Sequence, residues 1–481
     1  MPESERSLKR AFTDENSDLR EMVFEYARER LQLNPPPLDG SATPKTLQER
    51  TGNTITEAGL GGAKALNLFA NSAATATISV DHPNFLSFIP CAPTEAARLF
   101  DLIVSASSIY GGSWLEGAGA IHLENQVLRF LSDEVGFPES AGGLFVQGGS
   151  LGNLSALVTA RQTALDALLV AGKPKPNNWA ILCSQEAHSS LKAAARVMDV
   201  DILWAPVDSE GRLTGSAVKA ALEANSANRV DPKTVFAIVG TSGTTNFGIV
   251  DDLQGIGEVA NANGIWFHID GAYGLAGILS EENKWRYQGS HLANSFVVDP
   301  HKWLFAPYDA CALVYREPEL ARRAHSQHGE YLEILQGGDE WNPSDYAFNL
   351  TRRCRGLPLW FSLATHGVEA YRNAITTSIQ LARRIANEIE KRPDLALVRQ
   401  PELGVVAFTK SGWTTADYSR WSDLLLERQQ AFVVPSSHLG QPMTRFAILN
   451  PETTFEDLVA ILNTMNTMDP MDTTETMEET L

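Results

Sequence analysis

The sequence predicts an α/β protein with a mainly parallel central sheet, helices on both faces of that sheet, and a small C-terminal α+β domain. Between Gly142 and Glu317, short apolar runs rich in β-branched residues alternate with helical segments. This alternation is typical of parallel sheets whose two faces are both buried. After Arg355, a long helical stretch is followed by shorter strands and helices. The length of 481 residues allows one large domain and a smaller one.

Seven short apolar segments are the expected strands of the large sheet. They are Gly143–Gln147, Trp179–Cys183, Ile202–Trp204, Val235–Val239, Trp266–Asp270, Ser295–Val298 and Ala312–Tyr315. Polar, glycine-rich or histidine-containing residues follow several of them. Open α/β sheets bind ligands at the carboxyl ends of their strands, so we expect the functional site at this edge.

The regions before and after the large domain follow a different pattern. Residues 1–80 form a predicted N-terminal helical segment, residues 81–355 the large domain, residues 356–467 the small domain, and residues 468–481 an acidic, disordered tail. Apolar residues at helical spacing predict a helix over Ser17–Leu33 that ends before the prolines at 35–37, because proline cannot continue a helix. This helix either packs on its own domain or docks as an arm on a second subunit.

The small domain has its own predicted elements. A long helical region extends to about Lys391, and a further helix lies near Tyr418–Gln429. The expected strands are Leu395–Thr409, Ala431–Pro435 and Arg445–Leu449, and the last helix begins near Thr454.

Composition excludes several classes of partner. The net charge of −19 disfavours nucleic acid and anionic membrane surfaces. The four cysteines form no C-x-x-C pair, so we expect reduced thiols and no metal site. The N-terminus lacks the apolar stretch of a signal peptide, and nowhere do roughly 18 apolar residues run uninterrupted. We therefore expect a soluble, cytoplasmic protein that acts on a small molecule.

The turn Gly148–Gly152 has two interpretations. Its sequence, Gly-Gly-Ser-Leu-Gly, fits the G-x-S-x-G elbow of a serine hydrolase, in which Ser150 is the nucleophile. The acid and the histidine that such an enzyme needs follow in the required order: Asp270 or Asp299, then His301 or His325. The same turn also suits phosphate binding by backbone N–H groups at the start of a helix, and we favour this second interpretation.

Lys302 is the strongest candidate catalytic residue. It directly follows a predicted buried strand, where a lysine is rare unless it is paired or used as a neutral amine. Asp270 ends another strand, and His188 stands just before a predicted helix. A lysine amine, an acid for a ring nitrogen, a histidine and a phosphate-binding turn are the groups that a pyridoxal phosphate site needs.

These residues lie in motifs through which the chain resembles the group II pyridoxal-phosphate-dependent amino acid decarboxylases. This family includes the aromatic amino acid, glutamate and cysteine sulfinate decarboxylases. The resemblance covers about residues 80–450 and rests on six motifs in order: His82-Pro83, Gln147–Asn153, Ala187–Ser190, Gly243–Thr245 with Asp251–Leu253, His268–Tyr273, and Asp299–Trp303. It implies the fold-type-I architecture of pyridoxal-phosphate-dependent transferases, and pyridoxal 5'-phosphate as the cofactor.

The resemblance assigns residues to the cofactor ring. Lys302 would hold the cofactor as an aldimine, and Asp270 would pair with the ring nitrogen. His188 would stack on one face of the ring and Ala272 would pack against the other.

The resemblance also assigns residues to the cofactor phosphate. It would bind the backbone N–H groups of Ser150 and Leu151, with Thr245, Asp299 and His301 nearby. Asp299 departs from relatives that have asparagine there. A carboxylate beside a phosphate requires a proton, a water or a compensating donor.

A tyrosine completes the predicted chemistry. After CO₂ is lost, a proton must return to the α-carbon to release an amine. In relatives a tyrosine of a mobile loop is assigned this task, and Tyr331 lies in a glycine-containing stretch suited to such a loop. Relatives that form an aldehyde instead typically have phenylalanine at this position or an altered active-site histidine. Tyr331 and His188 therefore favour simple decarboxylation.

The predicted function is conversion of an aromatic or other bulky L-amino acid to a primary amine and CO₂. Phe88–Cys91 resembles the aromatic decarboxylases, although Cys91 replaces a common threonine. Gly112 falls where an aromatic residue often lines the pocket, which predicts a roomier or differently shaped pocket. Relatives build this site from two chains, so the resemblance implies a homodimer. The alternatives are an aldehyde synthase, a transaminase, and a serine hydrolase that uses Ser150.

Overall fold

The computed structural model describes residues 17–327 and 340–468. The large domain contains a seven-stranded sheet with the order β1-β7-β6-β5-β4-β2-β3. The strands are β1 (Gly142–Val146), β2 (Trp179–Ser184), β3 (Asp201–Ala205), β4 (Thr234–Thr241), β5 (Trp266–Asp270), β6 (Ser295–Val298) and β7 (Cys311–Tyr315). From β3 to β6 neighbouring strands are parallel, whereas β7 is antiparallel to both β6 and β1. The predicted mainly parallel sheet is confirmed.

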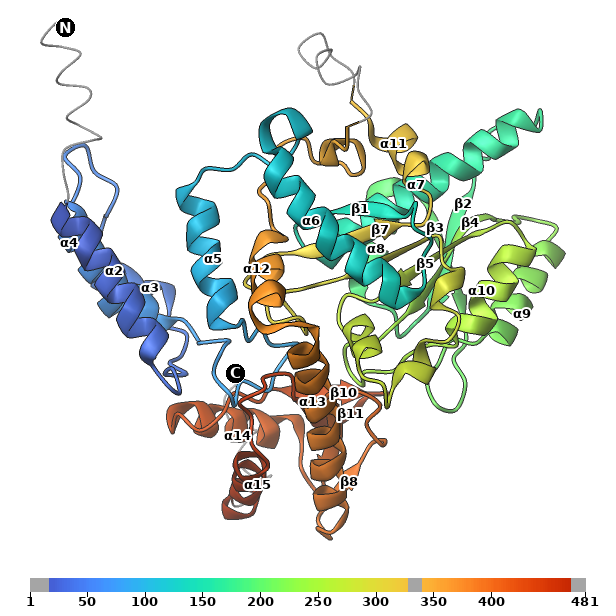
Figure 1. Ribbon diagram of the computed structural model, residues 1–481. Coiled ribbons are helices and arrows are strands. Elements are labelled where there is room, and N and C mark those ends of the chain that lie inside the picture. The colour runs from blue at the N-terminus through green and yellow to red at the C-terminus, as the bar shows by residue number, and fades with distance from the viewer. Residues whose placement is uncertain (1–16, 328–339, 469–481) are drawn as a thin grey trace, which may run out of the picture.

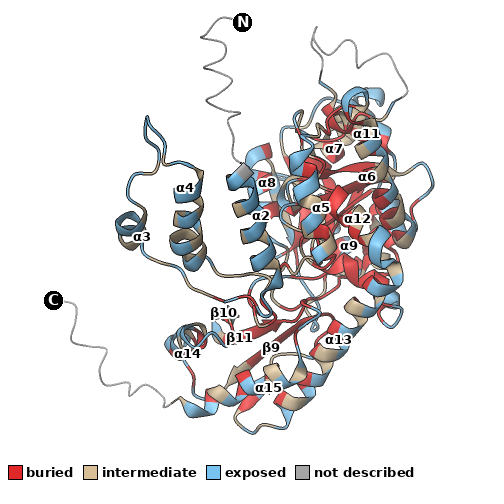
Figure 2. Ribbon diagram, turned by 60° about the vertical axis from the view of Figure 1, so that its left-hand side comes forward, coloured by how far each residue is buried: buried red, intermediate tan, exposed pale blue. Residues whose placement is uncertain are grey.

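Helices cover both faces of this sheet (Figure 1). On β6, Phe296 and Val298 join one apolar cluster and Val297 joins another. The first cluster includes residues of α6 (Trp114–Val135), α9 (Gly215–Ala227) and α10 (Leu253–Ala262). The second includes residues of α7 (Gly149–Val170), α8 (Ser189–Met198) and α11 (Pro318–His325). Burial on both faces, visible in Figure 2, explains why the strands are apolar runs in the sequence.

The small domain has a four-stranded antiparallel sheet with the order β10-β11-β9-β8. Its strands are β8 (Leu395–Leu397), β9 (Val405–Lys410), β10 (Pro435–His438) and β11 (Gln441–Ala447). The helices α13 (Val368–Glu390), α14 (Thr415–Glu427) and α15 (Phe455–Thr464) pack on this sheet. The helix α12 (Leu357–His366) precedes them and packs on α5 (Glu95–Ala106). The predicted α+β domain is confirmed.

The expected strand Leu395–Thr409 is wrong in one respect, because it is divided into β8 and β9. Residues 398–404 leave the sheet and contact the large domain. There Glu402 pairs with Arg212 at 2.6 Å and with Arg286 at 2.8 Å. The apolar pattern does not reveal this insertion, since residues such as Leu403 are buried in the core of the large domain.

The expected strand Ala431–Pro435 is also displaced. The strand β10 begins at Pro435, and Phe432 instead forms an isolated parallel bridge with Phe85. The apolar residues before β10 are thus buried against a segment that comes some 350 residues earlier in the chain. The third expected strand is β11, which begins earlier than expected, at Gln441.

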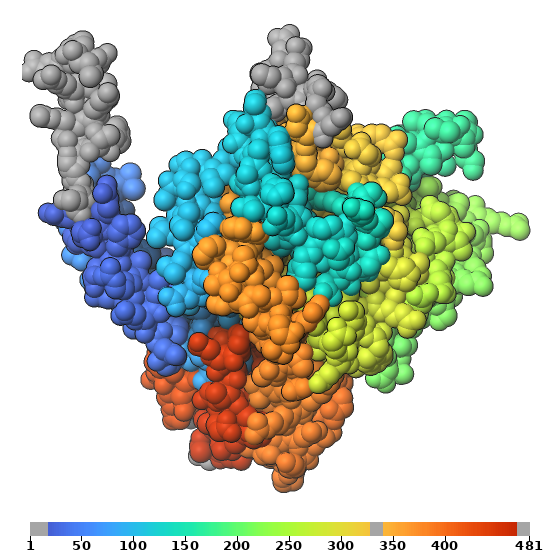
Figure 3. All heavy atoms as spheres, viewed as in Figure 1, coloured from blue at the N-terminus to red at the C-terminus, as the bar shows by residue number. Residues whose placement is uncertain are grey.

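The N-terminal helices project from the side of the molecule (Figures 1 and 3). The first, α2 (Ser17–Gln32), is the predicted helix, and α3 (Pro44–Thr51), α4 (Gly62–Leu68), η1 (Phe69–Ala73) and η2 (Ala74–Ala76) follow. None of the described residues in these elements is buried. The end of α2 is held to the body by Arg30, which pairs with Asp81 at 2.8 Å.

Short helical turns complete the described structure. They are η3 (Gly274–Leu279), η4 (Lys284–Tyr287), η5 (Ser290–Leu292), η7 (Pro343–Asp345) and η8 (Met465–Thr467). Within the described ranges, no helix is both long enough and apolar enough to cross a membrane. The predicted acidic tail lies outside the described residues from position 469 onward.

Candidate active site

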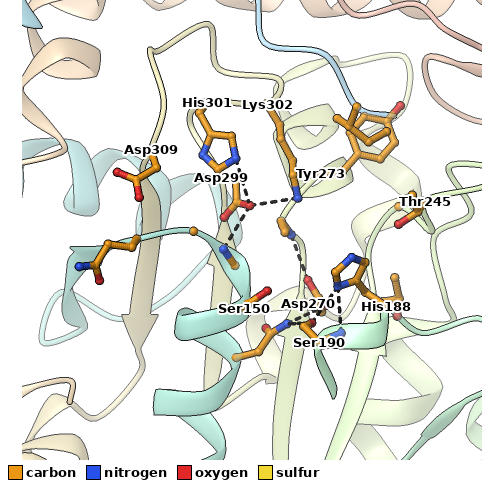
Figure 4. Close-up of a pocket in the computed structure, with 18 residues that line it drawn as sticks. Ser150, His188, Ser190, Thr245, Asp270, Tyr273, Asp299, His301, Lys302 and Asp309 are labelled. Atoms are coloured by element: carbon orange, nitrogen blue, oxygen red, sulfur yellow. Dashed lines mark hydrogen bonds and ion pairs between the residues drawn. The ribbon is translucent and has the colours of Figure 1, made fainter. Parts of the chain in front are cut away.

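A cavity of about 270 Å³ lies at the carboxyl ends of β4, β5 and β6, beside the first turns of α7 and α8 (Figure 4). Eight of the residues predicted from the sequence line it: Ser150, His188, Thr245, Asp270, Ala272, Asp299, His301 and Lys302. The cavity thus lies at the sheet edge where we expected the functional site. Leu151 does not line the cavity, and Tyr331 lies outside the described residues.

Lys302 is positioned by the turn that follows β6. Its backbone N–H donates to Asp299 O at 2.9 Å, and its Nζ lies 3.0 Å from Asp299 Oδ2. Burial alone would lower the pKa of Lys302, but the charge of Asp299, its hydrogen bond to Nζ and the charge of Asp270 together raise this pKa above its ordinary value. The amine is therefore protonated at neutral pH in this arrangement.

Asp270 is the last residue of β5, and its side chain is buried at the floor of the cavity. Its Oδ2 accepts a hydrogen bond from Asn153 Nδ2 at 2.9 Å, and its Oδ1 accepts one from the Ala272 N–H at 3.3 Å. Both donors are neutral, so the carboxylate keeps its full negative charge for a partner in the cavity.

His188 caps the N-terminus of α8. Its Nδ1 accepts a hydrogen bond from the Ser190 N–H at 3.1 Å and lies 2.9 Å from Ser190 Oγ. Because Nδ1 is an acceptor, the proton of the neutral imidazole is assigned to Nε2. Ser190 also accepts a hydrogen bond from Asn153 Nδ2 at 3.1 Å, so one amide bonds both Asp270 and Ser190.

Sequence reasoning did not single out Asn153 and Ser190 as site residues, although both line the cavity. Both lie in motifs that carry the family resemblance. Helical spacing could have identified Asn153, because it lies four residues after Gly149 and therefore on the same face of α7.

The start of α7 forms a tight cradle. The Gly149 N–H donates to Asp299 Oδ2 at 3.2 Å, and a Cβ atom on Gly149 would lie 3.0 Å from the Ala272 Cβ. Leu151 does not line the cavity, and its N–H, which was expected to bind the phosphate, already donates to Gly148 O at 3.1 Å. Ser150, by contrast, is exposed there.

Asp299 is 2% exposed. Both carboxylate oxygens of Asp270 accept hydrogen bonds, whereas only one oxygen of Asp299 has such partners in the described structure. Asp299 Oδ2 contacts Lys302 and Gly149, whereas its Oδ1 has no nitrogen or oxygen donor in reach. The Cys311 thiol, a weak donor, also contacts this carboxylate. We expected a compensating donor beside Asp299. Lys302 Nζ and the Gly149 N–H are such donors.

His301 is held by the backbone on the far side of Lys302. Its Nδ1 lies 2.7 Å from Ala310 O, and its Nε2 lies 3.8 Å from Asp299 Oδ2. Burial lowers the pKa of His301, although the charge of Asp299 opposes this shift. A neutral imidazole therefore lines this wall of the cavity at neutral pH.

The geometry gives no support to a serine hydrolase. His325 is buried between Thr159 and Ser155, with its Nε2 3.1 Å from Thr159 Oγ1 and 3.0 Å from Ser155 O. Among the residues that the structure describes, no hydrogen bond joins Ser150 to a histidine. A nucleophilic serine needs such a base within hydrogen-bond reach.

Two of the sequence motifs have structural tasks. Asp251 accepts hydrogen bonds from the Thr241 N–H at 2.7 Å and the Leu213 N–H at 2.8 Å. Asp252 caps α10 through the Gly255 N–H at 2.9 Å. His82 accepts a hydrogen bond from the Asn84 N–H at 2.9 Å. These residues fix turns near the site and do not line the cavity.

Two residues were expected to shape the substrate pocket, and for Gly112 the expectation concerns a site built from two chains and stays a prediction. Cys91 is buried, donates to Ala306 O at 3.2 Å, and does not line the cavity, whereas Ile89 does. Gly112 is covered by its own chain, because a Cβ there would lie 2.3 Å from the Tyr110 hydroxyl oxygen. Within this one chain, Gly112 therefore adds no space to the cavity.

The cavity fits the cofactor that the resemblance implies. Its amine, the Asp270 carboxylate and the helix N-terminus match the aldehyde, the ring nitrogen and the phosphate of pyridoxal phosphate. One detail supports the fit: a side chain on Gly149 would fill the cradle at the helix N-terminus.

Comparisons with known proteins agree with this fit. Residues 64–411 match the family model described as the pyridoxal-dependent decarboxylase conserved domain. The chain is 30% identical to an aromatic-L-amino-acid decarboxylase of Bacillus atrophaeus, over 89% of this chain and 90% of that protein. It is 26% identical to a 3,4-dihydroxyphenylacetaldehyde synthase of Aedes aegypti, over 78% of this chain and 74% of that protein. The fold matches a crystal structure of Oryza sativa TDC with PLP and tryptamine, with a TM-score of 0.86 at 22% identity over 95% of this chain and 98% of that one.

Proposed function

The chain belongs to the pyridoxal-dependent decarboxylase family, and from this premise we propose that it removes CO₂ from an L-amino acid with an aromatic or other bulky side chain. It is a pyridoxal-phosphate-dependent amino acid decarboxylase. The products in this proposal are CO₂ and a primary amine. The observation that carries the proposed chemistry is one cavity in which Lys302, Asp270 and His188 converge beside the start of α7.

Lys302 attaches the cofactor. When bound, pyridoxal phosphate takes up the electron pair that remains at the α-carbon after CO₂ leaves. The raised pKa of Lys302 means that its amine must first lose a proton, because only a neutral amine attacks an aldehyde. Asp299 Oδ2, 3.0 Å away, is a group that holds this proton on the amine.

Asp270 and His188 hold the reacting groups. Asp270 presents a buried negative charge to the ring nitrogen and keeps a proton on it. His188 presents its protonated Nε2 to the cavity, because Nδ1 is bonded to Ser190. Ala272, which follows Asp270 by two residues, also lines the cavity and would pack against the cofactor ring. Together these residues would orient the bond that breaks.

The start of α7 binds the phosphate. Ser150 supplies its hydroxyl and its N–H, Thr245 faces the cavity from the loop after β4, and His301 closes the wall beside Lys302. Leu151 has no part in this proposal, because its N–H already bonds Gly148 O. The positive end of the helix favours an anion here.

The preference for an aromatic or bulky substrate rests on two observations. The most extensive curated match reported above acts on aromatic amino acids. In addition, Ile89, from the segment that resembles the aromatic decarboxylases, lines the cavity. An apolar side chain at this position favours an apolar substrate group, because burying such a group against isoleucine removes apolar surface from water.

Tyr331 remains a prediction as the residue that returns a proton to the α-carbon. Its role decides between an amine and an aldehyde as product. The similarity to an aldehyde synthase keeps the aldehyde alternative open, whereas His188 and Tyr331 favour the amine.

We also propose that the protein acts as a homodimer in the cytoplasm. On α5, Leu99, Leu102 and Ile103 are between 43% and 49% exposed, and Phe348 is 75% exposed. These apolar groups, and the N-terminal helices without a buried residue, suit contact with a second copy. All four cysteines are free, in keeping with a reducing compartment. Light scattering on purified protein tests the dimer, and microscopy of tagged protein tests the compartment.

The decisive experiment combines absorption spectra with product analysis. The purified protein is titrated with pyridoxal phosphate and then with a panel of aromatic, histidine and glutamate substrates, while CO₂ and amine are measured. We expect a visible cofactor band that responds to an aromatic substrate as CO₂ appears. Equal amounts of aldehyde and peroxide would favour the synthase alternative. A colourless protein in which Ser150 reacts with a fluorophosphonate would favour the hydrolase.

A further inference from the structure

A chain of buried polar groups extends from Asp270 into the core of the large domain, away from the cavity. Asn153 Oδ1 lies 2.9 Å from His268 Nε2, and His268 Nδ1 lies 2.8 Å from Ser295 Oγ. The Trp266 indole nitrogen donates to the same Ser295 Oγ at 2.8 Å. Nothing in the roles assigned above to Asp270 uses these residues.

The directions of the hydrogen bonds in this chain follow from its Asp270 end. A carboxylate can only accept, so Asn153 turns its Nδ2 toward Asp270 and its Oδ1 toward His268. An indole N–H can only donate, so Ser295 Oγ accepts from Trp266 and keeps its hydroxyl hydrogen for His268 Nδ1. The neutral imidazole then carries its proton on Nε2 and donates to Asn153 Oδ1. This contact fixes the amide, so that its two N–H groups point to Asp270 and to Ser190.

The burial of the chain supports these assignments. His268 and Ser295 are fully buried, and Asn153 is 1% exposed. Burial lowers the pKa of His268 to about 4, with Asp270 and Ser295 opposing the shift, so the imidazole is neutral at working pH. The Asn153 side-chain amide forms three hydrogen bonds, two from Nδ2 and one to Oδ1, which makes any other orientation of the amide costly.

We propose that Asn153 is a positioning residue that aims Asp270 at the cofactor ring nitrogen and, through Ser190, couples Asp270 to His188. The inference rests on the proposed role of Asp270. A donor on the carboxylate favours its charged form and restricts its rotation. The histidine, serine and tryptophan behind Asn153 keep that donor in place, because they satisfy the only acceptor of its amide.

The test replaces the amide with a group of the same shape that cannot form hydrogen bonds. In Asn153→Leu we expect the dissociation constant of pyridoxal phosphate, measured by fluorescence quenching, to rise about tenfold, since a hydrogen bond to a charged group is lost. With ¹⁵N-labelled pyridoxal phosphate, the ring-nitrogen resonance of the bound cofactor should move toward that of an unprotonated pyridine. A purely structural role would not move this resonance.

Ser155→Ala is the matched control. Ser155 lies on α7 and is 1% exposed, and its hydroxyl has no partner in the described structure. Its removal should leave both the dissociation constant and the resonance unchanged. If Asn153→Leu does not fold, Asn153→Ala serves instead, because alanine fits the helix without a clash.

A double-variant cycle separates this inference from the proposed function. In the Asp270→Asn background, adding Asn153→Leu should change the dissociation constant of pyridoxal phosphate less than twofold. The reason is that the carboxylate that Asn153 positions is already absent. If Asn153→Leu leaves binding and resonance unchanged while Asp270→Asn alters both, the inference on Asn153 is wrong. If Asp270→Asn also changes neither, the proposed role of Asp270 itself is wrong.

Discussion

The two ends of the cavity each contain a buried aspartate, and the two residues differ in their partners. Asp270 ends β5 and is 5% exposed, and Asp299 follows the adjacent strand β6 and is 2% exposed. Asp270 is bonded by two neutral donors, the Asn153 amide and the Ala272 N–H. Asp299 is bonded by a cation, Lys302, and by the Gly149 N–H.

This difference indicates a difference in task. Neutral donors leave the charge of Asp270 available to a cationic ring nitrogen. The ammonium group of Lys302 instead neutralises much of the charge of Asp299, as long as that ammonium group is present. We therefore expect changes at the Asp270 end to impair the reaction itself, and changes at the Asp299 end to alter how the cofactor is captured.

The largest expected effect is the loss of Lys302, the residue that joins the two ends. Lys302→Ala removes the only amine among the residues that line the cavity, so covalent capture of pyridoxal phosphate should be abolished. Borohydride reduction followed by mass spectrometry measures the adduct. Lys284→Ala, at a half-exposed lysine paired with Glu134 and Glu281, is the control and should keep the adduct. An undiminished adduct in Lys302→Ala contradicts the assignment.

The next largest effect tests the Asp270 end. Asp270→Asn keeps the shape of the side chain but removes its charge, so the ring nitrogen loses the partner that keeps its proton. We expect the rate of decarboxylation to fall about a thousandfold, the scale found when one buried electrostatic contact to a transition state is removed. Stopped assays of released CO₂ measure it. If Asp299→Asn lowers the rate of decarboxylation more than Asp270→Asn does, the reaction itself depends more on the Asp299 end, contrary to our expectation.

The sequence predicts the fold and most of the site, because both depend on residue type and position along a strand. Apolar runs define the seven strands, and the residues after them identify the sheet edge that holds Asp270, Asp299 and Lys302. The spacing of residues does not tell which donor reaches which oxygen. That is why Asn153 was missed, and why Leu151 was assigned to the phosphate although its N–H is used within the turn.

The same limit applies to the small domain. The loop with Glu402 and the pairing of Phe432 with Phe85 both depend on contacts between residues far apart in the chain. A local pattern of apolar residues predicts burial, but it does not identify the surface against which a residue is buried. The predicted strands were therefore placed in the right region and with wrong limits.

Tyr331→Phe tests the return of a proton to the α-carbon, the step that completes the reaction. Without the hydroxyl group, proton return to the α-carbon should slow, and amine formation should fall about a hundredfold, within the range of general acid catalysis. We expect aldehyde and peroxide to appear in place of part of the amine. Chromatography of the products measures both, with Tyr308→Phe as the control at a tyrosine that does not line the cavity. Unchanged amine without aldehyde removes Tyr331 from the mechanism.

A smaller effect is expected for the variant Asp299→Asn. Here the rate of covalent cofactor capture should depend on pH, which distinguishes the Asp299 end of the cavity from the Asp270 end. Asp299 raises the pKa of Lys302, so removing its charge lowers that pKa and increases the fraction of neutral amine at neutral pH. In Asp299→Asn, covalent capture at pH 7.5 should therefore be about tenfold faster, because a larger fraction of the Lys302 amine is neutral at this pH. In the unaltered protein the capture rate should rise with pH, and the two rates should converge in alkali.

Stopped-flow absorbance measures this capture, and pyridoxal without its phosphate is the control. If the acceleration comes from Lys302, it should occur with both aldehydes. An acceleration confined to pyridoxal phosphate would instead mean that Asp299 acts by repelling the phosphate, and an unchanged rate with both would contradict any effect of Asp299 on Lys302.

The smallest expected effect concerns the cradle at the start of α7. In Gly149→Ala the new Cβ would lie 3.0 Å from the Ala272 Cβ and 3.2 Å from Asp299 Oδ2, so the turn must shift by a few tenths of an ångström. We expect the dissociation constant of pyridoxal phosphate to rise about fivefold, since such shifts weaken but do not remove the N–H contacts to an anion. Gly119→Ala on α6, where no atom lies within 4 Å of the new Cβ, should bind the cofactor normally. If Gly149→Ala binds phosphate-free pyridoxal as well as the unaltered protein does, the defect lies at the phosphate end alone, as the comparison requires. Equal weakening for both ligands would place Gly149 in contact with the ring as well.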